Sequence, residues 1–145
     1  MKKFVFRLEN LLKYRHRALQ ATERKLAVQS QKYNAVMESI SQCEYEKERT
    51  YMIYGTEKSP IEDLRQAEIY RRGLQQRIDL HKKELIVLEK ARAAAQSEYL
   101  QQKKYYRALE ILKEKELNAY KVKKNRYTEK VLDDILLAQK YAENL

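Results

Sequence analysis

The chain has 145 residues, of which 36% are charged and 43% hydrophobic, with two Phe, no Trp and a formal net charge of +10. This composition has too few bulky apolar residues for a compact core and is typical of long helices that bury a narrow seam, so it favours an all-α coiled coil over a globule. The single cysteine, Cys43, rules out a disulfide within the chain, and no apolar run approaches the roughly 20 residues of a membrane span. We therefore expect a cytoplasmic protein without direct membrane insertion.

A heptad stripe predicts a first helix over residues 3 to 54. All of its members except Lys47 are apolar or aromatic. The stripe consists of Val5, Leu12, Leu19, Leu26, Tyr33, Ile40, Lys47 and Tyr54. A companion stripe is mixed and consists of Leu8, Arg15, Thr22, Gln29, Val36, Cys43 and Thr50. One apolar and one mixed stripe predict a two-stranded coiled coil with a partly polar seam.

The only proline and one of the two glycines lie five positions apart, between the periodic segments. Gly55 is expected to end the first helix in a left-handed C-terminal cap. Ser59 is expected to be the N-cap of the next helix, with Pro60 in its first turn and Glu62 as the capping-box acid. These signals predict a turn over residues 55 to 59 and two helices that pack antiparallel as a hairpin.

A second helix is predicted over residues 60 to 142. Its seam residues keep spacings of three and four, and they are Leu64, Leu74, Ile78, His81, Leu85, Leu88, Ala95, Tyr99, Tyr106 and Leu109. After Leu109 the phase slips, which marks a stutter or a change of partner. Gly73 lies inside this helix, where glycine costs about 1 kcal/mol relative to alanine. It is either a tolerated surface glycine or a place where another chain approaches closely.

Folding about residue 57 sets the register of the expected hairpin. Position i would then lie opposite about 115 minus i, so that Val5 would lie near Glu110. The second helix is longer than the first, and everything after about residue 114 would overhang. An unpaired helix with its own apolar stripe usually marks a partner site.

The positive charge is concentrated in two blocks. Residues 1 to 27 carry eight Lys or Arg against two acids, and residues 101 to 126 carry nine against three, while the remaining segments are close to neutral. The predicted hairpin would bring these two blocks together at the end opposite the turn. Such a basic end favours an acidic partner.

No catalytic or metal site is predicted, so we expect a non-enzymatic binding protein without a cofactor. His16 and His81 are far apart, and Cys43 would face about residue 72, with no histidine beside it. The chain has no Gly-rich phosphate loop. Tyrosines among the basic residues are compatible with nucleic acid, but no nucleic-acid-binding motif accompanies them. The pattern therefore favours an acidic protein partner over nucleic acid.

Two segments resemble the FliJ family of flagellar type III export proteins. The opening FVFRLENLLKYRHRALQATERKLA, residues 4 to 27, follows the family pattern F-x-F-x-L-x-x-L-L-x-x-R, which is carried by Phe4, Phe6, Leu8, Leu11, Leu12 and Arg15. The segment YRRGLQQRIDLHKKEL, residues 70 to 85, resembles the segment that follows the family's turn, with an aromatic residue, a Leu four later and a His seven after that. The length, the turn and the basic charge agree over the whole chain.

The resemblance implies a stalk-like component of the flagellar export apparatus. Proteins of this family are antiparallel coiled coils similar to the central stalk, or gamma subunit, of rotary ATPases. The resemblance implies three partners: the hexameric export ATPase, whose assembly or activity the stalk promotes, the cytoplasmic domain of the export gate membrane protein, and export chaperones. The chain would thereby serve flagellum biogenesis, motility and chemotaxis. An export-chaperone escort or adaptor is the main alternative, and a nucleic-acid-binding coiled coil is a further one.

The charge pattern and the resemblance together assign residues to two surfaces. The ATPase ring would meet the basic end, which comprises Lys2, Lys3, Arg7, Lys13, Arg15, Arg17, Lys103, Lys104 and Arg107. The export gate would meet Tyr45, Tyr70, Leu74, Arg77 and His81. The seam pattern instead places Leu74 and His81 between the helices, so the sequence leaves their exposure open. Arg15 is also open, because its stripe position allows a packed stem with the charged end in water.

Overall fold

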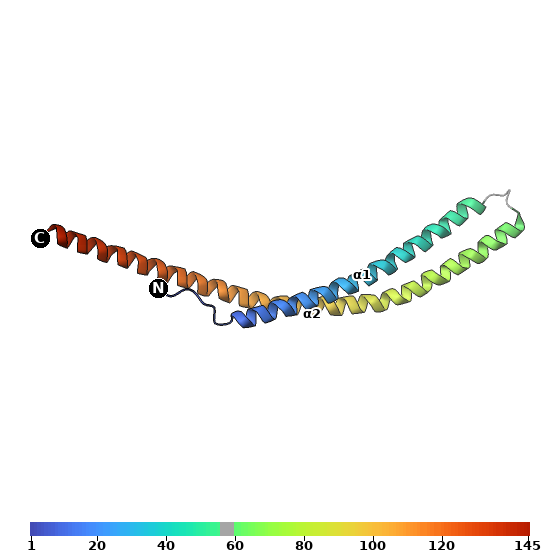
Figure 1. Ribbon diagram of the computed structural model, residues 1–145. Coiled ribbons are helices and arrows are strands. Elements are labelled where there is room, and N and C mark those ends of the chain that lie inside the picture. Colours follow the sequence, from blue (N-terminus) through green and yellow to red (C-terminus); the bar gives the residue numbers. More distant parts are fainter. Residues whose placement is uncertain (56–59) are drawn as a thin grey trace. The chain divides into compact units, whose positions relative to one another are not determined.

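The computed structural model describes residues 1 to 55 and 60 to 145, which contain two helices (Figure 1). Helix α1 spans Glu9–Tyr54 and helix α2 spans Ile61–Glu143. The predicted all-α fold with a longer second helix is confirmed. The chain forms two compact units: a terminal unit, made of Met1–Gln20 and Gln101–Leu145, and a hairpin unit, Ala21–Leu100. The single domain expected over the whole chain stays a prediction.

The hairpin unit buries a seam between antiparallel segments of α1 and α2. Its core cluster is Val36, Ile40 and Ile78, against which Cys43, Leu85 and Leu88 pack. Thr22 and Thr50 of the mixed stripe are also buried. The Thr50 hydroxyl donates to the Glu46 carbonyl at 2.8 Å, so it has the hydrogen-bond partner that a buried polar group needs. The seam is therefore partly polar, as the heptad pattern predicted.

The register of the two helices differs from the expected one by about two helical turns. Lys47 Nζ donates to Gln75 Oε1 at 2.7 Å in the hairpin unit, and Lys113 pairs with Glu9 at 2.9 Å in the terminal unit. Position i therefore lies opposite about 122 minus i, not about 115 minus i. Burial of large apolar side chains in the seam sets this register, whereas the midpoint of the turn does not. The first turns of α2 consequently run past the end of α1, where Ile61 is 85% exposed.

Helix α1 ends at Gly55 for a different reason from the one expected. The Gly55 N–H donates to the Tyr51 carbonyl at 2.8 Å. No described residue has a positive φ, so the left-handed cap is wrong. A Cβ at Gly55 would instead collide with the carbonyl oxygen of Tyr51, which explains the glycine. At Gly73 a Cβ would meet no atom within 4 Å, which supports the surface reading of that residue.

The start of α2 is described from Pro60 onward, and the predicted N-cap Ser59 lies outside the described residues. The Pro60 carbonyl accepts the first helical hydrogen bond from the Leu64 N–H at 3.1 Å, so Pro60 immediately precedes the helix. Glu62 occupies the first turn, where its negative charge is stabilised by the helix dipole. Leu64, which was expected in the seam, is exposed because α2 begins beyond the end of α1.

The N-terminal residues 1 to 8 precede α1, so the helix expected from residue 3 begins at Glu9 instead. Phe6 is 4% exposed and Val5 is 81% exposed, while the Phe4 ring lies 5.6 Å from that of Tyr120. Alternating burial is the period of an extended chain. An extended segment directs both phenylalanines inward, which a helix would not do, and it moves Val5 out of the predicted seam.

The unpaired part of α2 begins later than expected. The Tyr120 hydroxyl donates to the Lys2 carbonyl at 2.6 Å, so α2 still contacts the N-terminal segment beyond residue 114. Residues 121 to 145 are all exposed. The unpaired segment is therefore residues 121 to 145, because both the register shift and the extended N-terminal segment cover more of α2.

Candidate functional site

The terminal unit contains every residue predicted to meet the ATPase ring. We call this set the basic surface, and it comprises Lys2, Lys3, Arg7, Lys13, Arg15, Arg17, Lys103, Lys104 and Arg107. Folding brings together cations from both ends of the sequence in one compact unit. All of them except Arg15 are exposed. Their contact with an ATPase stays a prediction.

Arg15, Lys103 and Arg107 of the basic surface each interact with another residue of the chain. The Arg15 guanidinium carbon lies 4.7 Å from the centre of the Tyr105 ring and 6.0 Å from that of Tyr14. This geometry holds the charge by a cation–π interaction, which supports the packed reading of Arg15. Arg107 pairs with Glu110 at 3.1 Å. A binding partner would have to compete with these contacts.

A cavity of about 420 Å³ opens beside the basic surface in the terminal unit. We call it the basic cavity, and it is lined by Glu9, Leu12, Lys13, His16, Arg17, Gln20, Tyr106 and Lys113. The residues from α1 recur at spacings of three and four, so they share one face of that helix. The sequence pattern had included Lys13 and Arg17 in the basic end, but it did not indicate a cavity.

One side of the basic cavity is lined by aromatic rings. The His16 and Tyr106 rings lie 5.3 Å apart and are tilted by 44°. Burial, followed by the charge of Glu110 and a hydrogen bond to it, raises the pKa of the Tyr106 hydroxyl above its usual range. Tyr106 therefore keeps its proton at physiological pH.

The hairpin unit contains all five residues predicted to meet the export gate. We call this set the hairpin surface, and it comprises Tyr45, Tyr70, Leu74, Arg77 and His81. Leu74 is 2% exposed and so lies in the seam, where it offers almost no surface to a partner. The His81 side chain is 32% exposed. The structure thereby decides the question that periodicity and resemblance left open: Leu74 is a seam residue and His81 is partly accessible.

Tyr70 connects the two helices at the hairpin surface. Its hydroxyl donates to Glu46 Oε2 at 2.7 Å. This hydrogen bond, followed by burial and the Glu46 charge, raises the pKa of Tyr70 above its usual value. Because a carboxylate accepts only from the protonated phenol, the contact favours neutral Tyr70.

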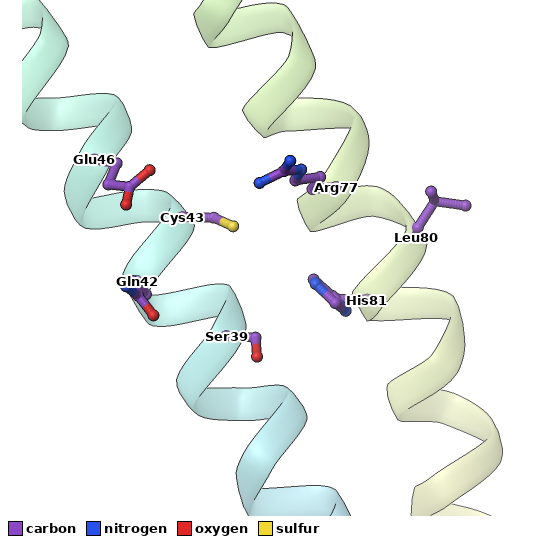
Figure 2. A pocket seen from close by; sticks show the side chains of 7 residues that line it. All are labelled: Ser39, Gln42, Cys43, Glu46, Arg77, Leu80 and His81. Carbon is purple, nitrogen blue, oxygen red and sulfur yellow. The ribbon is translucent and has the colours of Figure 1, made fainter.

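A second cavity, of about 470 Å³, opens at the hairpin surface (Figure 2). It is lined by Ser39, Gln42, Cys43, Glu46, Arg77, Leu80 and His81. The side chains of Cys43 and His81 point toward each other from α1 and α2 (Figure 2). The expectation that Cys43 has no histidine beside it is therefore wrong, because the true register places it opposite about residue 79. His81 Nδ1 also lies 3.5 Å from Glu84 Oε2.

Within residues 1 to 55 and 60 to 145, no group of three or more His, Cys, Asp and Glu side chains is placed to hold a metal ion. Within the same ranges, neither helix has a stretch that is long and apolar enough to span a bilayer.

Sequence reasoning missed Glu9, His16, Tyr106 and Lys113 as residues of the basic cavity. Glu9 and Lys113 are unremarkable helix-surface charges until the register places them 2.9 Å apart. The only signal available in the sequence was the shared helical face of Glu9, Lys13 and Arg17. Their partners on α2 depend on the register, which the sequence placed two turns away.

Two long helices of unequal length, with cations from both ends of the sequence in one unit, define a helical-hairpin class of binding protein. The chain belongs to the family of flagellar FliJ proteins, whose family model matches residues 3–144. It is therefore a non-catalytic component of the flagellar type III export apparatus, which confirms the resemblance. Comparisons with curated proteins and with solved structures found no match.

Proposed function

We propose that this chain is a stalk-like coiled coil that binds the hexameric export ATPase, promotes its assembly or activity, and links it to the export gate. The ATPase meets the basic surface of the terminal unit, and the cytoplasmic domain of the gate protein meets the hairpin surface. The protein acts in the cytoplasm at the base of the export apparatus. The observation that carries this proposal is the concentration of exposed cations from both ends of the sequence in the terminal unit.

The physical basis of ATPase binding is electrostatic complementarity. Exposed cations steer an acidic partner over long range and raise the association rate. The screening length falls from about 10 Å in 0.1 M salt to about 3 Å in 1 M salt. We therefore expect ATPase binding to weaken markedly as salt rises. Binding that is insensitive to salt would shift the contact to apolar side chains such as those of residues 121 to 145.

Measuring ATP hydrolysis and hexamer assembly of the cognate ATPase, with and without this chain, tests the first half of the proposal. We expect the chain to stimulate ATP hydrolysis or hexamer assembly. If neither changes, the proposed stalk function is wrong. The double variant Lys2→Gln/Lys3→Gln should weaken stimulation. Its matched control is Lys82→Gln/Lys83→Gln, which removes the same charge from exposed positions of the hairpin unit and should leave stimulation unchanged.

Titrating the isolated cytoplasmic domain of the gate protein into the chain tests the second half. Tyr45→Ala and His81→Ala should weaken this binding, because both side chains are accessible at the hairpin surface. Lys104→Gln is the control, since it changes an exposed residue of the terminal unit. Gate binding that survives both hairpin variants would show that the gate contacts another surface.

The chaperone-escort function has its own supporting observation, the exposed segment of residues 121 to 145. Tyr127, Val131 and Ile135 in this segment are exposed and largely apolar, and their spacing places them on one helical face, which suits a helix-in-groove partner. A variant that ends at residue 120 keeps the contact of Tyr120 with the N-terminal segment. Loss of chaperone binding with ATPase stimulation intact would favour the escort function, and loss of stimulation would favour the stalk.

A further inference from the structure

The basic cavity of the terminal unit holds two cations without a counter-ion among the described residues. Lys13 and Arg17 lie one helical turn apart on the same face of α1, and both are exposed. Neither has an ion-pair partner within residues 1 to 55 or 60 to 145. Like charges at this spacing repel each other. An anion placed between them would relieve that repulsion.

The other side of the cavity is already neutral. Lys113, the third cation of the lining, pairs with Glu9 at 2.9 Å. The Glu9 carboxylate repels any further anion that approaches Lys113. An anionic group is therefore received at the side of Lys13 and Arg17.

Apolar and aromatic side chains support the two free cations. Leu12 is buried, and the Tyr106 ring packs beside His16. When a binding partner covers the cavity, such walls help to exclude water and lower the local dielectric, which strengthens a charge-assisted hydrogen bond. The volume of about 420 Å³ lies in the range of ligand-sized cavities. It accommodates the stem of a side chain as well as its charged end.

We infer that the basic cavity receives the carboxylate of an Asp or Glu side chain of the protein that binds the terminal unit. The carboxylate accepts hydrogen bonds from the Arg17 guanidinium, whose fork matches its two oxygens, and from the Lys13 ammonium. An exposed ion pair alone improves affinity by at most about fivefold, so the carboxylate must be held by a larger protein interface and is not a free small acid. The inference rests on the proposed function, in which this protein is the export ATPase.

The first test compares two double variants for binding to the cognate ATPase. Lys13→Gln/Arg17→Gln removes the free cations of the cavity, and Lys2→Gln/Lys3→Gln removes the same charge from exposed positions that do not line it. We expect the dissociation constant to rise about tenfold or more for the cavity variant and about two- to threefold for the control. Circular dichroism should show unchanged helix content in both, since all four side chains are exposed.

A further variant should strengthen ATPase binding instead of weakening it. Glu9→Gln releases Lys113 and adds a third free cation to the cavity, so it should tighten ATPase binding by about three- to fivefold. Glu114→Gln is the matched control, because it removes the same charge from an exposed position of the terminal unit and should change binding less than twofold. If Glu9→Gln and Glu114→Gln change ATPase binding equally, the basic cavity is not a specific binding site for a carboxylate.

A double-mutant cycle identifies the partner's carboxylate. Acidic residues of the ATPase are changed to Asn or Gln one at a time, and binding to the wild-type chain and to the cavity variant is compared. One acidic residue should cost about tenfold against the wild-type chain and almost nothing against Lys13→Gln/Arg17→Gln. If none of the tested acidic residues shows this coupling, the inference is overturned.

Failure of the inference can be told apart from failure of the proposed function. If the cavity variant and the Lys2/Lys3 control weaken binding equally, diffuse positive charge accounts for the interaction. The inferred carboxylate site is then wrong, while the proposed stalk function stands. If the wild-type chain does not bind the ATPase even at low salt, the proposed function itself fails.

Discussion

Replacing Leu74 with alanine removes one of the two most deeply buried side chains of the hairpin unit. Leu74 and Ile78 are each 2% exposed, and they face α1 across the seam. The substitution deletes three carbon atoms, each worth about 0.8 kcal/mol when buried. The void left behind adds a further cost where neighbours do not relax. Because the seam is only one layer of side chains thick, neighbours and water fill the void easily, and we expect a total of about 2 to 3 kcal/mol.

Urea unfolding followed by far-ultraviolet circular dichroism measures this cost as a lower midpoint at unchanged slope. Leu80→Ala is the matched control, since the same atoms are removed from a side chain that is 65% exposed. That variant should change the free energy of unfolding by less than about 0.5 kcal/mol.

If Leu74→Ala costs less than about 1 kcal/mol and abolishes binding of the export gate domain, Leu74 faces a partner and the seam assignment is wrong. If stability falls as expected, any loss of gate binding by this variant follows from the weakened hairpin. The gate contact must then be sought among accessible residues such as Tyr45 and His81.

Further substitutions probe the backbone, the polar seam and the Tyr70 contact. Gly73→Ala should raise the free energy of unfolding by about 1 kcal/mol, because the added Cβ meets no atom within 4 Å. Gly55→Ala should lower the free energy of unfolding, because the added Cβ collides with the carbonyl oxygen four residues earlier. Thermal unfolding measures both variants, and equal effects would contradict these expectations. Thr50→Val should raise stability by up to about 1 kcal/mol, since the buried hydroxyl donates to a carbonyl of its own helix. A clear loss in urea unfolding would show that this hydroxyl has a stabilising role. The hydrogen bond to Glu46 raises the pKa of Tyr70 above 10.0, so its stabilising effect is fully present below the ordinary tyrosine pKa and is lost as the pH rises through the raised value. An absorbance titration of tyrosinate should show that Tyr70→Phe removes one late-titrating tyrosine, and that Glu46→Gln brings this titration to lower pH; unchanged curves would contradict the contact.

The helices and the break between them follow from local sequence. Their residues are strong helix formers, and the apolar stripe with Ile40 and the mixed stripe with Val36 have the heptad spacing of a seam. Gly55 and Pro60 lie between the two periodic segments. The basic blocks at the two ends also follow directly, because charge is a property of composition. For these features, each residue acts through neighbours within a few positions.

The register, the extended N-terminal segment and the basic cavity were decided by tertiary structure. The stripes repeat every seven residues, so a slide of one heptad leaves the same residue classes facing each other, and local pattern cannot distinguish the two registers. Burial of particular side chains, such as Leu74 and Ile78, selects one of them. The extended segment that carries Phe4 and Phe6 has a helix to pack against only because α2 continues past the start of α1 to Tyr120.

The basic cavity depends on that same choice. Lys13 and Arg17 share a helical face whatever the register, but Tyr106 and Lys113 lie beside them only when position i faces about 122 minus i. In the register expected from the turn, different residues of α2 would line this face, and Glu9 would face about Tyr106 instead of Lys113. The sequence by itself determined which residues are basic, apolar or helix-breaking. The long-range packing of one helix on the other decided which of them meet, because that packing free energy is summed over the whole seam and is not carried by any local segment.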